Sequence, residues 1–147
     1  MTPQDQVIEI AERWIGTPYH HQARIKGAGV DCGQLLIAVF AEAGMCPPDL
    51  DVGHYSHDWA FHRNDEIYLQ WVKEFCVKKN VADVPQKGDI AVFRFGRAAS
   101  HGTIVKTWPL VIHSFFGRGV IISSANDIDL AGRLDSIWMP RPWAVKS

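Results

Sequence analysis

The second half of the sequence holds a series of strand-like segments joined by very short connections, and this series limits the possible folds most. Each segment is rich in β-branched or aromatic residues and is bounded by Gly, Pro or small residues. Strands joined by such short connections run antiparallel to one another. The sequence therefore predicts an antiparallel meander with strands over residues 89–95, 101–106, 110–115 and 120–123, a turn over 96–100, and a short last strand near 137–139.

The first half of the sequence has helical periodicity instead. Thr2 and Pro3 are typical of a helix start, and apolar residues at helical spacing follow until Gly16. Helices followed by strands indicate the α+β class. The length of 147 residues fits a single domain, residues 1–147. Further helices are predicted over residues 32–43 and 65–75, with loops over 17–31 and 45–64.

The charge balance excludes some classes of partner. The chain has 15 Lys and Arg against 16 Asp and Glu, for a net charge of −1. This balance gives no electrostatic footprint for nucleic acid or for an anionic membrane. No apolar run is long enough to span a bilayer, and the N-terminus lacks the basic start and apolar core of a signal peptide. We therefore expect no nucleic acid partner, no membrane insertion and synthesis in the cytoplasm without a signal peptide.

The three cysteines are Cys32, Cys46 and Cys76. An odd and sparse count argues against a disulfide framework, and no closely spaced pair suggests a structural zinc site. Free thiols are therefore expected. Cys76 lies at the end of the predicted third helix, where it fits a small buried hydrophobe.

Cys32 differs from the other two by its position at the predicted start of a helix, directly after Asp31. A helix N-terminus carries free N–H groups and a partial positive charge, which favour the thiolate, the nucleophilic form of cysteine. The same N–H groups can stabilise a developing oxyanion. The alternative is that Cys32 only fills the core, as most buried cysteines do.

A nucleophilic thiol needs a base, and the base needs a group that orients it. His101 opens one predicted strand and His113 lies in the next, so the hairpin brings their imidazoles close together. Cys32 would then be the nucleophile, His101 the general base and acid, and His113 the group that holds the His101 tautomer. The spacing alone leaves a second interpretation open, in which both histidines are half-buried strand residues without a catalytic role.

An ordered set of short motifs resembles the NlpC-type papain-like cysteine peptidases over roughly residues 5–123. The set consists of the sequence WIGTPY at 14–19, Asp31-Cys32, Lys87-Gly88-Asp89 before a strand, His101-Gly102 at the start of the next strand, and Ile112-His113. The resemblance implies a minimal papain-like α+β fold, with N-terminal helices packed on an antiparallel sheet meander. It also implies that Cys32, His101 and His113 are catalytic and that no cofactor is needed. The implied reaction is hydrolysis of peptide bonds in bacterial peptidoglycan stem peptides, commonly between D-glutamate and a diamino acid.

The longer sequence TPYHHQARIKGAGVDC, residues 17–32, resembles the subgroup encoded with phage tails and phage-like gene transfer particles. This resemblance implies phage tail proteins as partners. It also implies that a particle assembled in the bacterial cytoplasm carries the protein to the cell wall, where it aids penetration.

Three residues near the predicted nucleophile are candidates for substrate binding: Tyr19, His21 and Asp31. Tyr19 matches a family position that lines the site, and its hydroxyl can hold an oxyanion or the substrate. Asp31 can pair with a substrate amine, although it is equally well explained as the helix cap. The family usually has Ser after the Cys, whereas this chain has Gly33, and the preference for a free stem-peptide amine is therefore in doubt.

Other functions remain open from the sequence. His54, His57 and His62 suggest metal binding only weakly, because no Cys or carboxylate accompanies them at ligand spacing. We expect no metal site, and thiol chemistry needs none. A catalytically silent structural tail component is one alternative function. A thiol-dependent amidase or acyltransferase on the same scaffold is another, since only the acyl acceptor differs.

Overall fold

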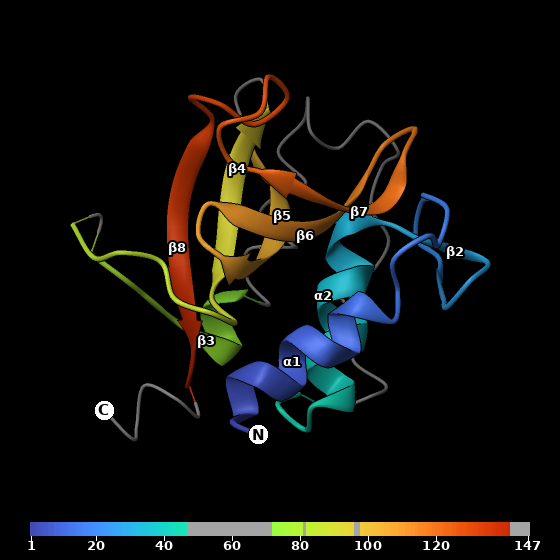
Figure 1. Cartoon of the computed structure of the whole chain (residues 1–147), viewed down its shortest axis with the longest axis horizontal. Helices are drawn as coiled ribbons and strands as arrows, with labels where there is room; N and C mark the ends of the chain where they lie inside the picture. The colour runs from blue at the N-terminus through green and yellow to red at the C-terminus, as the bar shows by residue number, and fades with distance from the viewer. Residues whose placement is uncertain (47–71, 81, 96–97, 142–147) are drawn as a thin grey trace.

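The computed structural model describes residues 1–46, 72–80, 82–95 and 98–141 (Figure 1). Among these residues, the first half of the chain forms two helices and a small hairpin, and the second half forms one large sheet. The elements are α1 (Pro3–Glu12), β1 (Arg24–Ile25), β2 (Gly29–Val30), α2 (Cys32–Glu42), β3 (Cys76–Lys78), β4 (Ile90–Phe95), β5 (Ala98–Thr107), β6 (Leu110–Phe115), β7 (Gly119–Ser124) and β8 (Leu134–Pro140). Helices followed by an antiparallel sheet confirm the α+β prediction.

The large sheet has six strands in the order β3-β8-β4-β5-β6-β7, and every neighbouring pair is antiparallel. The strands from β4 to β7 follow one another as the predicted meander. β8 then returns across the sheet to pair between β3 and β4, so it is an interior strand and longer than the sequence predicted. Its consecutive residues Ser136–Trp138 are buried because both faces of the sheet are covered there: Trp138 packs into one apolar cluster and Ile137 into another.

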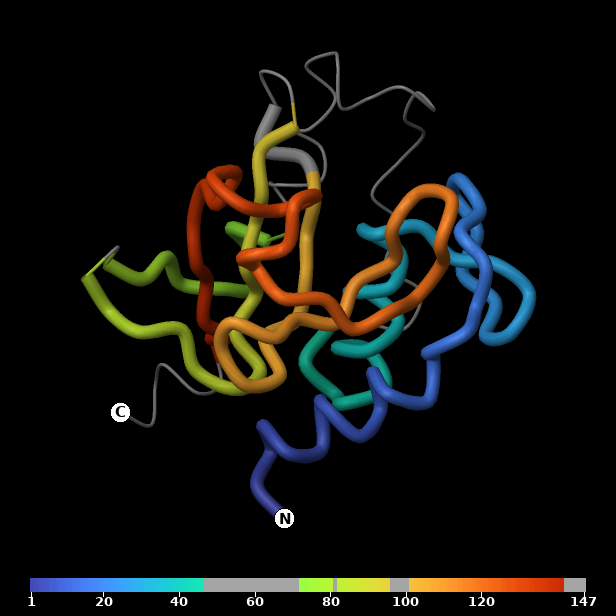
Figure 2. The backbone as a smooth tube through the Cα atoms, turned by 45° about the horizontal axis from the view of Figure 1, so that its top comes forward, coloured from blue at the N-terminus to red at the C-terminus, as the bar shows by residue number. Residues whose placement is uncertain are grey.

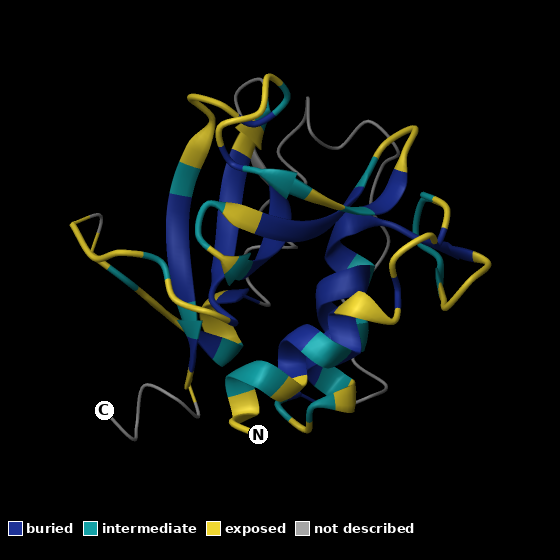
Figure 3. Ribbon diagram, in the orientation of Figure 1, coloured by how far each residue is buried: buried dark blue, intermediate teal, exposed yellow. Residues whose placement is uncertain are grey.

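The two helices cover one face of this sheet. α2 packs on β5 and β6, and α1 packs on α2 and on β5. Figure 2 shows these helices on one side of the molecule and the strands β3, β4 and β8 on the other. The main core lies between helices and sheet, where Leu35, Ile104 and Ile112 are fully buried (Figure 3). A smaller apolar cluster around Phe93 and Val111 covers the opposite face of the sheet.

Both helices start where the sequence predicted. Thr2 caps α1 in a reciprocal capping box with Asp5, and Asp31 caps α2. α1 ends at Glu12, about a turn before the predicted stop, and the chain then runs through turns to Gly16. The shorter helix brings the loop that follows it to the edge of β7, where Gly16 and Thr17 hydrogen-bond to the backbone of Val120.

Three local predictions from the sequence are wrong. The loop over 17–31 contains the β1–β2 hairpin. The small residues of the predicted turn at 96–100 instead begin β5, since Ala98 and Ala99 pair with the end of β4 after a bulge. Cys76 starts β3 and not the end of a helix, because its backbone pairs with Pro140 of β8. Residues 72–75 are helical, and the rest of the predicted third helix lies outside the described residues, as does most of the loop 45–64.

The three cysteines are buried and free, as predicted from their odd count. In the described part of the chain, no helix is long and apolar enough to cross a membrane.

Gly119 allows the loop after α1 to approach the sheet. Its φ is +77°, and a Cβ at this position would collide with the carbonyl oxygen of Thr17. The same oxygen accepts a hydrogen bond of 2.9 Å from the backbone N–H of Val120. The loop and β7 therefore sit too close for any side chain at this position.

We expect Gly119→Ala to lower the free energy of unfolding by about 3 kcal/mol, the sum of left-handed backbone strain and a backbone collision. Gly117→Ala is the matched control, because Gly117 has a φ of +84° and nothing within 4 Å of the added Cβ. The control should lose only about 1–2 kcal/mol. Urea unfolding measures both variants, and equal losses would show that the contact with Thr17 contributes nothing.

Candidate active site

Cys32 is the first residue of α2, and Asp31 holds it there. The Asp31 carboxylate is 1% exposed and accepts two backbone hydrogen bonds. One comes from the N–H of Gln34 in the first turn of α2, at 2.8 Å, and the other from the N–H of Gln22 in the preceding loop, at 2.7 Å. Asp31 is therefore the helix cap that the sequence predicted. Amine binding by Asp31 stays a prediction.

The other predicted pair, His101 and His113, is in direct contact. His101 Nε2 lies 2.7 Å from His113 Nδ1, and the two rings meet edge to face with centroids 5.0 Å apart. The register of β5 and β6 pairs Ile104 with Ile112, which makes His113 the diagonal neighbour of His101. The predicted contact across the hairpin is therefore confirmed. Phe95 and Phe115 pack edge-on against the His101 ring.

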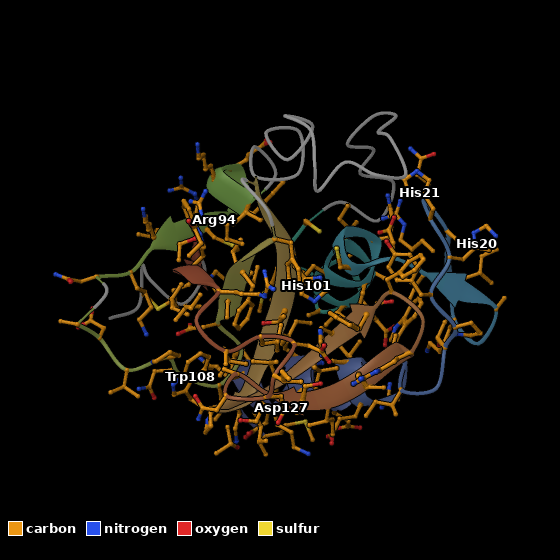
Figure 4. The ribbon with its side chains drawn as sticks, turned by 90° about the horizontal axis from the view of Figure 1, so that it is seen from above. His20, His21, Arg94, His101, Trp108 and Asp127 are labelled. Atoms are coloured by element: carbon orange, nitrogen blue, oxygen red, sulfur yellow. The ribbon has the colours of Figure 1, made fainter. Side chains whose placement is uncertain are left out.

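The thiol lies against the middle of β5, at the residue that follows His101. The backbone N–H of Gly102, the residue after His101, donates a hydrogen bond to the Cys32 sulfur. Figure 4 shows His101 beside α2, the helix that begins at Cys32. Nε2 of His101 is hydrogen-bonded to His113. Nδ1 of His101 is therefore the ring nitrogen that remains to accept the thiol proton. The structure thus joins the imidazoles of His101 and His113 across β5 and β6, and it places the Cys32 sulfur at the start of α2 against the backbone next to His101.

The Cys32 thiol is protonated at neutral pH. Burial, and then the negative charge of Asp31, raise the pKa of Cys32 to about 12. The N–H groups of Gly102, Gly33 and Cys32 lower the pKa, but by less. The helix N-terminus therefore acts in the direction that the sequence suggested, but desolvation outweighs it, and the resting group is a thiol.

Both imidazoles are neutral at neutral pH. Burial, assisted by the neighbouring His113, holds the pKa of His101 well below its usual value near 6.5. Burial also lowers the pKa of His113 to about 4, and Arg118 adds to this effect, while Asp129 and Asp127 oppose it. A neutral His101 can accept the thiol proton, so the resting site is a thiol beside a base and not a preformed ion pair.

This protonation state predicts how Cys32 reacts with iodoacetamide. The rate of Cys32 labelling should keep rising with pH from 6 to 9 without a plateau, since the thiolate fraction rises as long as the pH is below the pKa. The labelling site is identified by mass spectrometry at each pH. A plateau that begins below pH 7 would show that a thiolate–imidazolium pair exists at rest.

Ser123 on β7 extends the histidine pair and was missed in the sequence. Its Oγ lies 2.8 Å from His113 Nε2. The register of β6 and β7 pairs Val111 with Ser123, so Ser123 is the diagonal neighbour of His113 on the same face of the sheet. Counting this alternation along the predicted hairpin would have found it.

Tyr19 lies close to Cys32 and Asp31. Burial, followed by the charges of Cys32 and Asp31, raises the pKa of the Tyr19 hydroxyl above its usual value, so the hydroxyl stays a donor. The Tyr19 ring packs edge-on against Phe116, which is 67% exposed. A single bridge to Val30 fixes the Tyr19 backbone. This position suits a residue that contacts substrate.

His21 lies apart from the histidine pair. Figure 4 shows His20 and His21 at the outer edge of the molecule, away from His101. Substrate binding by His21 therefore stays a prediction without support from this geometry. Across the described ranges, no group of three His, Cys, Asp or Glu side chains is placed to hold a metal ion. His54, His57 and His62 lie outside the described residues.

Comparisons with known proteins identify the fold. No family model matches the sequence, and no curated protein matches it. Among solved structures, an NlpC/P60 family protein from Bacillus cereus ATCC 10987 matches 91% of this chain with a TM-score of 0.67 and 20% identity. The NlpC/p60 domain of the peptidoglycan hydrolase SagA matches 91% with a TM-score of 0.62 and 18% identity. NlpC1 from Trichomonas vaginalis matches 92% with a TM-score of 0.64 and 14% identity.

The matched proteins differ in how much of their length this chain spans. It covers 96% of the SagA domain, but only 39% of the Bacillus cereus protein and 44% of the Trichomonas vaginalis protein. All three matches cover at least 91% of this chain. The chain has the fold of NlpC/P60 domains.

Proposed function

We propose that this protein is a cysteine peptidase that hydrolyses peptide bonds in the stem peptides of bacterial peptidoglycan, and that residues 1–147 act as one domain. One observation carries the proposal. The N-terminus of α2 places the buried thiol of Cys32 against the strand that carries His101, a neutral histidine. Nε2 of His101 is hydrogen-bonded to Nδ1 of His113 at 2.7 Å. A scaffold without turnover has no need of this arrangement.

The proposed reaction begins with attack of Cys32 Sγ on the carbonyl carbon of the substrate. As the new C–S bond forms, the thiol proton passes to Nδ1 of His101, which becomes an imidazolium. The His101 Nε2–H donates to His113 Nδ1, and this hydrogen bond stabilises the new positive charge. We propose that N–H groups at the start of α2, together with the Tyr19 hydroxyl, stabilise the oxyanion.

The second half of the reaction releases the products. His101 returns the proton to the leaving amine, the C–N bond breaks and a thioester on Cys32 remains. Water then attacks the thioester carbonyl while His101 removes its proton. The thioester breaks, Cys32 leaves as the thiol, and the acyl fragment leaves as a carboxylic acid. The thiol and the base are therefore both regenerated.

The substrate proposal draws on two sources. The sequence motifs resemble those of peptidases that act between D-glutamate and a diamino acid, and one protein of similar fold is named a peptidoglycan hydrolase. We therefore propose the D-glutamyl–diamino acid bond as the target. Gly33 lacks the hydroxyl that would help to grip a free stem-peptide amine, so intact or cross-linked stem peptides fit the proposal as well as trimmed ones.

Incubation of the purified protein with peptidoglycan tests this proposal, with mass spectrometry of the soluble fragments. The expected products carry a new carboxyl group on glutamate and a new amino group on the diamino acid, and Cys32→Ala should yield none. Equal digestion by both proteins would contradict the mechanism. No digestion by either would favour a structural tail component, and products joined to an added amine would favour an acyltransferase.

We also propose that the protein is a component of a phage tail or phage-like particle, assembled in the bacterial cytoplasm with other tail proteins and active at the cell wall. The resemblance of residues 17–32 supports this role. Particles that lack the protein should adsorb to host cells but fail to inject their DNA. Normal injection by such particles would count against the tail role and leave the peptidase proposal intact.

A further inference from the structure

His113 joins two side chains on neighbouring strands into one hydrogen-bonded series. His101 Nε2 on β5 is 2.7 Å from His113 Nδ1 on β6, and His113 Nε2 is 2.8 Å from Ser123 Oγ on β7. The His113 side chain is almost fully buried at 1% exposure, so water has little access to it. Ser123 is the partner that the described residues give to this ring nitrogen.

Proton counting gives this series a direction. To accept a proton at Nδ1, neutral His101 must carry its own hydrogen on Nε2 and donate it to His113 Nδ1. His113 is neutral and has one N–H, which must then be on Nε2 and point at Ser123 Oγ. In the reverse arrangement His113 Nδ1–H donates to His101 Nε2, and His101 carries its hydrogen on Nδ1. That nitrogen would then have no lone pair for the thiol proton.

We propose that Ser123 is a positioning residue: its Oγ accepts a hydrogen bond from His113 Nε2–H and thereby holds both histidines in the tautomers that the reaction needs. The inference rests on the proposed peptidase function, and Ser123 acts through His113 without touching the substrate. The acceptor matters most once His101 is an imidazolium. Both of its nitrogens then donate, so His113 must accept at Nδ1 and donate from Nε2.

A side chain without an oxygen at position 123 removes the preference of His113 for protonation at Nε2. The His113 Nε2–H would be buried without an acceptor, which is costly, whereas the reverse tautomer leaves only an acceptor nitrogen without a donor. The charged groups that act on His113 are Arg118, Asp127 and Asp129. They shift the pKa of His113, but the structure gives none of them a hydrogen bond to Nε2 within the described residues.

The test compares Ser123→Thr with Ser123→Val. The two side chains have nearly the same shape and both suit a strand, but only threonine keeps the hydroxyl. We expect the Thr variant to retain most of the parent activity on a stem peptide. The Val variant should lose about 10- to 100-fold in kcat, as expected for a hydrogen bond to a charged network, with KM unchanged. Equal kcat values for Thr and Val would overturn the inference.

Nitrogen-15 NMR of the histidine rings tests the hydrogen-bond direction without any substrate. The parent and the Thr variant should show His113 protonated at Nε2, and the Val variant should show protonation shifted to Nδ1. A parent protein with His113 protonated at Nδ1 would overturn the inference even if it digests peptidoglycan. If the parent digests nothing, the peptidase proposal fails by itself, and the ring spectra still decide whether Ser123 sets the tautomer.

Discussion

Cys32→Ala and His101→Ala should each lower kcat/KM on a stem-peptide substrate by about 10⁴-fold or more. The first variant removes the attacking sulfur, and the second removes the group that takes the thiol proton. Because the two side chains act in one step, the double variant should be no slower than either single variant. The measurement is the rate of fragment release from a synthetic stem peptide.

Cys46→Ala is the matched control for this prediction. Cys46 is also buried and outside any disulfide, and its thiol donates a hydrogen bond of 3.8 Å to the carbonyl oxygen of Ile37 in the middle of α2. The Cys46→Ala variant should therefore leave the rate of hydrolysis unchanged. Circular dichroism checks that all variants are folded. Hydrolysis by Cys32→Ala at the parent rate, or losses that multiply in the double variant, would contradict a shared step.

The second large effect concerns acid stability. The pKa of His113 is about 4 in the folded protein against an ordinary value near 6.5, so the unfolded chain binds more protons between these two values. The stabilising contribution is complete above pH 6.5 and is lost as the pH falls toward 4. For His113 it amounts to about 3 kcal/mol in the free energy of unfolding, and the lowered pKa of His101 acts in the same direction.

Urea unfolding between pH 4 and pH 7.5 measures this effect, and His113→Asn isolates it. The variant removes one titrating group, so its stability should change less over this range than that of the parent. Asp89, whose pKa burial raises, has an opposite effect that is common to both proteins and cancels in the comparison. Asp5 titrates lower, with a pKa of about 2. Equal slopes for parent and variant would show that His113 is not buried in its neutral form.

Features of the fold and the site were predictable from the sequence where they depend on a short stretch of the chain. The cap at Asp31 depends on one side chain and the turn that follows, and it was predictable from residue type and spacing. The closeness of His101 and His113 was predictable from the hairpin, but its register was not, because the two strands shift register between Val105 and Thr107. The meander itself follows from residue type and spacing.

Properties that depend on distant parts of the chain were not predictable. The strand at Cys76 forms because β8, far along the sequence, offers its backbone for pairing. The pKa of Cys32 depends on how completely the sheet and helix exclude water from the thiol, which no local pattern encodes. Ser123 lies between these cases, because its face of the sheet follows from alternation, whereas its hydrogen bond to His113 depends on the register of β6 and β7.

The placement of Cys32 on α2 and of His101 on the sheet has a consequence for how activity relates to folding. The nucleophile and its base come from opposite halves of the chain, and packing of α2 on β5 and β6 is what joins them. A nascent or partly folded chain, with the helix formed but not docked, would possess every catalytic group and still be inert. In the proposed mechanism, turnover therefore reports on the docking of the two halves, because the catalytic groups meet only when that docking is complete.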